Sequence, residues 1–102
     1  MTRIVVTAPD IMTAEPAASL NPVALAAGWS FPGATRIVCG TRTLYLTLDG
    51  RRYEYALPAE AEYALGLYYD SGEMTEFSFT LDKPVASYPF RLAAVQQGRW
   101  AA

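Results

Sequence analysis

Two runs of alternating hydrophobic and polar residues flank the pair Asp49-Gly50 in the middle of the chain. Asp-Gly accommodates the positive φ angles of a type I′ turn, whose twist matches that of antiparallel strands. Residues 41–57 are therefore expected to form a two-residue β-hairpin. The predicted cross-strand pairs are Leu48 with Arg51, Leu46 with Tyr53 and Leu44 with Tyr55. This register sends two sets of side chains to opposite faces, with Leu44, Leu46, Tyr53 and Tyr55 inward and Tyr45, Thr47, Arg52 and Glu54 outward.

Three further segments have the pattern of strands. The β-branched residues of 3–8 indicate a short strand ended by Pro9, and residues 75–81 alternate with Phe77, Phe79 and Leu81 inward. Residues 36–39 are expected to form another strand, joined to the hairpin by a second tight turn at Gly40-Thr41. The expected pairs are then Cys39 with Arg42 and Ile37 with Leu44.

Hydrophobic residues recur at helical spacing after Pro58, which suits the first turn of a helix because proline has no N–H to leave unpaired. The stripe consists of Leu57, Ala61, Ala64, Leu65 and Tyr68. The pattern predicts a helix over 58–70 that lies on the sheet and ends at Asp70-Ser71-Gly72. Gly66, a poor helix former, suggests close approach of this helix to the sheet.

The segment 9–33 is rich in proline and is expected to cover one end of the core, with one short helix capped by Asn21 and closed by Gly28. Trp29 and Phe31 would seal the core, although a segment of this kind is also typical of a binding loop. Residues 86–97 fit either a strand or a helix, and we favour a strand. Trp100 is either a clip onto the core or an exposed contact residue.

These elements predict an α+β fold in a single domain, 1–102. The expected architecture is a mostly antiparallel sheet of about five strands with one main helix (58–70) packed on one face.

Composition excludes most enzyme classes. The 102 residues include one cysteine, Cys39, and no histidine, so neither an internal disulfide nor the usual imidazole chemistry is expected. Cys39 lies in a predicted strand and is expected to be a buried, inert thiol. We therefore expect a protein that is not an enzyme and has no cofactor or metal. Pro9, Asp10, Glu15 and Pro16 interrupt the first thirty residues, which indicates no signal peptide or membrane span and a cytoplasmic location.

Acidic residues are concentrated in one part of the chain. The net charge is −2, yet residues 53–82 carry many Asp and Glu residues and no Lys or Arg. Such a run is typical of a solvated surface, and it also suits docking onto a basic partner. The expected partner-binding residues, on the helix and turn over 60–76, are Glu60, Glu62, Tyr63, Tyr69, Asp70, Glu73 and Glu76. The expected function is a non-enzymatic interaction module that binds and blocks a basic, nucleic-acid-binding surface of a partner such as a nucleic-acid-guided nuclease complex.

Two other functions are open. The outer face of the hairpin offers an aromatic ring and arginines that suit RNA or single-stranded DNA, namely Arg36, Tyr45, Arg51 and Arg52. Alternatively, the protein is a self-associating structural subunit, such as a homodimer, that uses Trp29, Phe31 or Trp100.

Residues 46–58, with the predicted helix after them, resemble the strand, turn, Tyr-x-Tyr, proline and helix core of the small bacterial and phage domains called KTSC. The likeness covers residues 44–70, and the later Lys-Thr-Ser-Cys-like signature of that family has no counterpart here. The resemblance implies an RNA-related role. In size, acidity and lack of a cofactor, the chain is also similar in type to phage-encoded inhibitors of the anti-CRISPR kind, a likeness that carries over no particular residue.

Overall fold

The central hairpin has the predicted register in a computed structural model that describes residues 1–90. It consists of β3 (Thr43–Leu48) and β4 (Arg51–Ala56), which pair from Leu48 with Arg51 to Thr43 with Ala56. The turn residues Asp49 and Gly50 have φ angles of 53° and 77°, as a type I′ turn requires. Leu44 and Leu46 are fully buried, which confirms the predicted inner face.

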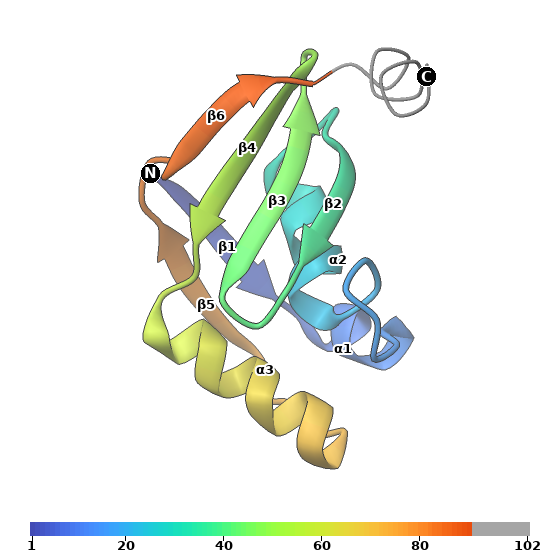
Figure 1. Cartoon of the computed structure of the whole chain (residues 1–102). Helices are drawn as coiled ribbons and strands as arrows, with labels where there is room; N and C mark the ends of the chain where they lie inside the picture. The colour runs from blue at the N-terminus through green and yellow to red at the C-terminus, as the bar shows by residue number, and fades with distance from the viewer. Residues whose placement is uncertain (91–102) are drawn as a thin grey trace, which may run out of the picture.

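The strands form two antiparallel sheets (Figure 1). The larger has the order β2-β3-β4-β6, where β2 is Thr35–Cys39 and β6 is Ala86–Pro89. The smaller pairs β1 (Thr2–Val6) with β5 (Phe77–Leu81). The α+β class is confirmed. The six strands of the described residues form two sheets, however, where a single sheet of about five strands was expected. The two sheets share one core, because Ile4 and Phe79 of the smaller sheet belong to the same cluster of buried side chains as Leu46 of the larger.

Three helices complete the fold: α1 (Ala8–Thr13), α2 (Pro22–Ser30) and α3 (Ala59–Ser71). The segment 9–33 thus contributes to two helices where one was expected. Asn21 caps α2 as predicted, because its Oδ1 accepts a hydrogen bond from the Ala24 N–H at 2.9 Å. Gly28 does not close α2, which continues to Ser30 and packs against β1 and β2.

Phe31 is buried as expected, with its ring 5.6 Å from that of Tyr55. The expectation that Trp29 plugs the core is wrong, because its side chain is 79% exposed. The reason is the length of α2. Each helical residue adds about 100°, so Trp29 lies about 200° around the helix from the fully buried Ala27 and faces outward.

The stripe predicted for α3 is buried at Ala61, Leu65 and Tyr68, which confirms that this helix contributes to the core. Pro58 occupies the N-cap position, and Gly72 ends the helix in the left-handed conformation at φ 77°. The expected close approach at Gly66 is wrong: Gly66 is exposed, and a Cβ added there would have no heavy atom within 4 Å.

The turn between β2 and β3 is longer than predicted. Cys39 pairs with Leu44 rather than with Arg42, and the Gly40 N–H donates to the Thr43 carbonyl at 2.9 Å. The expected pair of Ile37 with Leu44 is lost as well. The pairing also shifts between Thr35 and Val38, where Arg36 adopts a φ of 50°. Such an irregularity absorbs the extra residue.

The strand favoured for the C-terminal segment is confirmed over Ala86–Pro89, which pairs with β4. The rest of the ambiguous range, 91–97, and Trp100 lie outside the described residues. Within residues 1–90, no helix is long and apolar enough to cross a membrane.

Candidate partner-binding surface

The seven residues predicted to bind a partner are all exposed in the folded chain. They lie on α3 and on the segment that leads from α3 to β5, at the end of the molecule drawn lowest in Figure 1. We call this set the acidic surface; it comprises Glu60, Glu62, Tyr63, Tyr69, Asp70, Glu73 and Glu76.

Part of the acidic surface surrounds a hollow of about 250 Å³ between α3 and residues 73–77. Glu60, Tyr63 and Leu67 line it from α3, and Glu73 lines it from the segment that follows. The tyrosine side chain is 71% exposed. Two carboxylates, a tyrosine and an apolar floor are thereby brought together, and the two carboxylates are thirteen positions apart in the sequence.

Other members of the acidic surface lie apart from this hollow. Glu62 is two residues after Glu60, so it projects from α3 about 200° away. Tyr69, seven residues after Glu62, lies on that same flank, and its hydroxyl accepts a hydrogen bond from Asn21 Nδ2 at 3.1 Å. The Glu76 carboxylate accepts a hydrogen bond from the Ala8 N–H at 2.6 Å. Tyr69 and Glu76 therefore also connect α3 and β5 to the N-terminal helices.

The charges of the acidic surface are not offset by hydrogen bonds from arginine within the described residues. The arginine side-chain bonds in this part of the chain go to neutral acceptors, namely Arg3 to Ser78, Arg51 to Ser87, and Arg52 to Thr47 and the Arg36 carbonyl. Arg51 begins β4, whereas α3 follows the other end of that strand. At about 3.3 Å per residue, the six residues of β4 separate Arg51 from the start of α3 by roughly 20 Å. Arg42 lies nearer to that start, because its carbonyl accepts a hydrogen bond from the Leu57 N–H at 2.9 Å.

Of the residues predicted to contact nucleic acid, Tyr45 and Arg52 lie on the face of the hairpin opposite Leu44 and Leu46, whereas Arg51 pairs with Leu48 on the other face. The Arg52 guanidinium is 5.6 Å from the ring centre of Tyr45 and 5.5 Å from that of Phe90. Its Nη1 donates to the Arg36 carbonyl at 2.8 Å and to Thr47 Oγ1 at 2.9 Å. The fold thus brings Tyr45 and Arg52 together, and Arg36, an exposed residue, contacts Arg52 through its backbone carbonyl.

Contacts with β6 lie on both faces of the sheet. Arg51 Nε donates to Ser87 Oγ at 3.0 Å on the face that carries Tyr53, and the Tyr88 hydroxyl donates to the Glu54 carboxylate at 2.9 Å on the face that carries Arg52. The hydrogen bond to Glu54 raises the pKa of the Tyr88 hydroxyl. The Glu54 carboxylate therefore lies on the same face as Arg52, and that face is mixed in charge.

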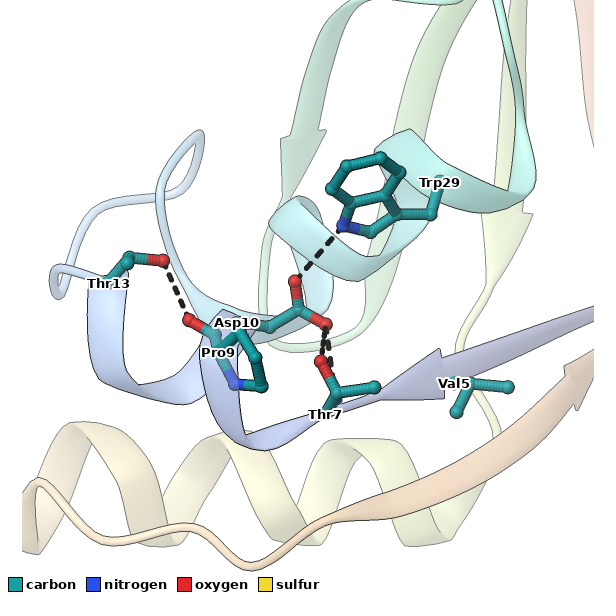
Figure 2. A pocket seen from close by; sticks show the side chains of 6 residues that line it. All are labelled: Val5, Thr7, Pro9, Asp10, Thr13 and Trp29. Carbon is teal, nitrogen blue, oxygen red and sulfur yellow. Dashed lines mark hydrogen bonds between the residues drawn. The ribbon is translucent and has the colours of Figure 1, made fainter.

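A third arrangement, around Asp10 and Trp29, was not predicted from the sequence (Figure 2). The Asp10 side chain is only 5% exposed. Its Oδ2 accepts hydrogen bonds from the Thr7 N–H at 3.0 Å and the Thr7 hydroxyl at 2.9 Å, and its Oδ1 accepts one from Trp29 Nε1 at 3.3 Å. The available signal was the Thr7-x-x-Asp10 spacing, which is typical of a helix N-terminus.

Cys39 is fully buried, as predicted. Burial raises the pKa of its thiol from 9.0 to about 12, so the thiol keeps its proton at neutral pH and is a poor nucleophile. No group of three or more His, Cys, Asp or Glu side chains in the described part of the chain could hold a metal ion.

Comparison of the chain with protein-family models, curated proteins and solved structures found no match. The resemblance to KTSC domains and the likeness to anti-CRISPR inhibitors therefore stay predictions, and functional inference depends on the residues themselves.

Proposed function

We propose that this protein is a non-catalytic interaction module that docks its acidic surface onto a basic surface of another protein. The observation that carries the proposal is the hollow in which Glu60 and Glu73 flank the exposed Tyr63. Charge complementarity speeds and orients docking, and tyrosine supplies rigid contact area at low entropic cost.

The hydrogen bonding of the arginines supports this proposal. In the described part of the chain their side-chain bonds go to neutral oxygens, so the carboxylates that line the hollow, Glu60 and Glu73, remain available to lysines and arginines of a partner. Exposed single ion pairs contribute about 0–1 kcal/mol each. Affinity would therefore come from several carboxylates acting together with Tyr63 and the apolar floor of the hollow.

The basic surface that we propose as the target is one that normally holds nucleic acid, because lysines and arginines gather where phosphates are bound. Occupying such a surface would make this protein an inhibitor of its partner. A phage-encoded inhibitor of a nucleic-acid-guided nuclease complex, acting in the cytoplasm, is the specific form of the proposal.

A two-residue charge reversal tests the proposal. Wild-type protein, E60K/E73K and the control E15K/D82K would each be immobilised as bait for host lysate, with bound proteins identified by mass spectrometry. The control reverses two exposed acids outside the acidic surface. We expect wild type and the control to retain the same basic partner and E60K/E73K to lose it. Equal retention by all three baits would reject the acidic surface as the docking site.

Competition tests the nature of the partner surface. Nucleic acid added to the retained complex should displace the partner if the acidic surface occupies a phosphate-binding groove. A complex that persists at saturating nucleic acid would show that the docking site lies elsewhere on the partner.

A second candidate function is binding of RNA or single-stranded DNA by the outer face of the hairpin. The arrangement that favours it is the Arg52 guanidinium close to the rings of Tyr45 and Phe90 and bonded to the carbonyl of exposed Arg36. Arg51 lies at the adjoining turn. Binding should appear in a titration with labelled oligonucleotide at low salt and should weaken as salt is raised. Absence of binding at low salt would remove this candidate.

A further inference from the structure

The side chain of Trp29 is both exposed and held in place. It is 79% exposed, yet its Nε1 donates to Asp10, which Thr7 fixes in turn through two hydrogen bonds (Figure 2). An aromatic ring that is already ordered before binding loses little conformational entropy when a ligand contacts it. Tryptophan is also enriched among the residues that dominate binding energy at interfaces.

The indole borders two hollows. One, of about 530 Å³, extends from Trp29 over Val5, Thr7 and Pro9. The other, of about 330 Å³, extends over Leu25 and Gly28. Asp10, Thr13 and Trp29 line both. The carboxylate of Asp10 therefore lies at the bottom of a largely apolar depression with an aromatic wall.

Asp10 has acceptor capacity to spare. Its carboxylate accepts three hydrogen bonds, two at Oδ2 and one at Oδ1, whereas a carboxylate offers about four acceptor positions. All three donors are neutral groups, so the negative charge is not offset by them. A cationic group that entered the hollow could approach Oδ1 while it lay against the indole.

We infer that the larger of the two hollows, which we call the Trp29 hollow, receives an arginine side chain of the basic partner. This inference rests on the proposed function. The apolar stem of arginine suits the surfaces of Val5 and Pro9, and its planar guanidinium suits stacking on an indole. Charge complementarity comes from Asp10. Arginine is favoured over lysine because a compact ammonium ion is more strongly hydrated and has no plane to stack.

The Trp29 hollow is connected to the acidic surface through α1. Glu76 bonds to the first residue of α1, and Ile11 lines a further hollow of about 450 Å³ together with Leu67 and Glu73. The same short helix thus supplies Asp10 on one side and Ile11 on the other. A partner bound to the acidic surface would therefore reach the Trp29 hollow by extending along α1.

The test uses fluorescence anisotropy of labelled nona-arginine and nona-lysine peptides at low salt. Wild type should bind nona-arginine more tightly than nona-lysine. W29A should lose roughly fivefold in affinity for nona-arginine, the scale of one partly exposed cation–π contact, and should change little with nona-lysine. W29F keeps an aromatic face and should retain most of the preference. M12A removes an equally exposed side chain of α1 (Met12 is 83% exposed) and is the control.

A second readout guards against misfolding of W29A. In a W100F background Trp29 is the remaining tryptophan, and its emission should change when nona-arginine is added but much less with nona-lysine. An arginine-to-lysine affinity ratio that is the same in wild type and W29A, or Trp29 emission that ignores nona-arginine, would overturn the inference.

The failure of the inference and the failure of the proposed function give different results. If E60K/E73K lowers the affinity for both peptides and W29A changes neither affinity, the acidic surface is supported as a docking site and the Trp29 hollow is rejected. If E60K/E73K binds both peptides as wild type does, the proposed function itself is wrong.

Discussion

Asn21→Ala should destabilise the fold by about 2–4 kcal/mol, because this fully buried side chain joins three elements. Its Oδ1 accepts from the Ala24 N–H at 2.9 Å and caps α2. Its Nδ2 donates to the Cys39 carbonyl of β2 at 2.8 Å and to the Tyr69 hydroxyl of α3 at 3.1 Å. Truncation to alanine removes all three hydrogen bonds together.

The magnitude follows from two contributions. Loss of an N-cap costs about 1 kcal/mol, and removal of the amide donor from the buried Cys39 carbonyl costs about 1–3 kcal/mol. A domain of this size is typically stable by about 5–15 kcal/mol. The variant should therefore still fold, with a clearly lower stability.

Urea unfolding followed by circular dichroism measures the effect. Asn21→Ser keeps a capping oxygen without burying a charge and loses the amide donors, so it should recover about 1 kcal/mol relative to alanine. Tyr69→Phe removes one hydroxyl and should cost no more than about 1 kcal/mol. A free energy of unfolding for Asn21→Ala within about 0.5 kcal/mol of wild type would refute the reasoning.

Three further predictions concern stability. Gly66→Ala should raise the free energy of unfolding by up to about 1 kcal/mol, because the added methyl meets no neighbour within 4 Å and alanine is the better helix former; a lower urea midpoint would contradict this. Leu46→Ala should cost about 2–5 kcal/mol because Leu46 is fully buried, and a cost below 1 kcal/mol would show that the site collapses. Burial raises the pKa of Cys39 from 9.0 to about 12, so the unfolded chain loses this proton first and stability falls as pH rises between those values. Between about pH 8 and pH 10, the free energy of unfolding measured in urea should fall less for Cys39→Ala than for wild type. An equal fall in the two proteins would contradict the raised pKa of Cys39.

The hairpin could be predicted in detail because its information is local. Asp49-Gly50 selects the turn, and the alternation of Leu44 and Leu46 with polar residues sets the register. The helix after Pro58 could be predicted equally well, since the hydrophobic stripe at helical spacing marks its buried face and Gly72 marks its end. Both elements depend on residues that are close together in the sequence.

The pairing of β1 with β5 could not be predicted because it joins residues 71 to 79 positions apart, from Val6 with Phe77 to Thr2 with Leu81. Neither strand has a local signal that says which neighbour it will take. The prediction that Trp29 is buried failed for a related reason. The outward position of its side chain depends on α2 continuing through Gly28, a residue that usually favours the end of a helix.

The candidate site was predictable in composition and less so in geometry. Charge segregation along the chain identified the acidic residues, but spacing alone did not show that Glu60 and Glu73 would line one hollow with Tyr63. The Asp10–Trp29 contact joins two segments that the sequence pattern treated as a single cover. Its discovery needed the three-dimensional position of α1.

The most direct test of the acidic surface as a docking site is chemical-shift mapping of the isotope-labelled protein with nona-arginine. The account predicts that the shifted amides concentrate within 59–76, together with the indole N–H of Trp29. Shifts that concentrate instead at Arg36, Tyr45 and Arg52, or that spread evenly over the molecule, would contradict it.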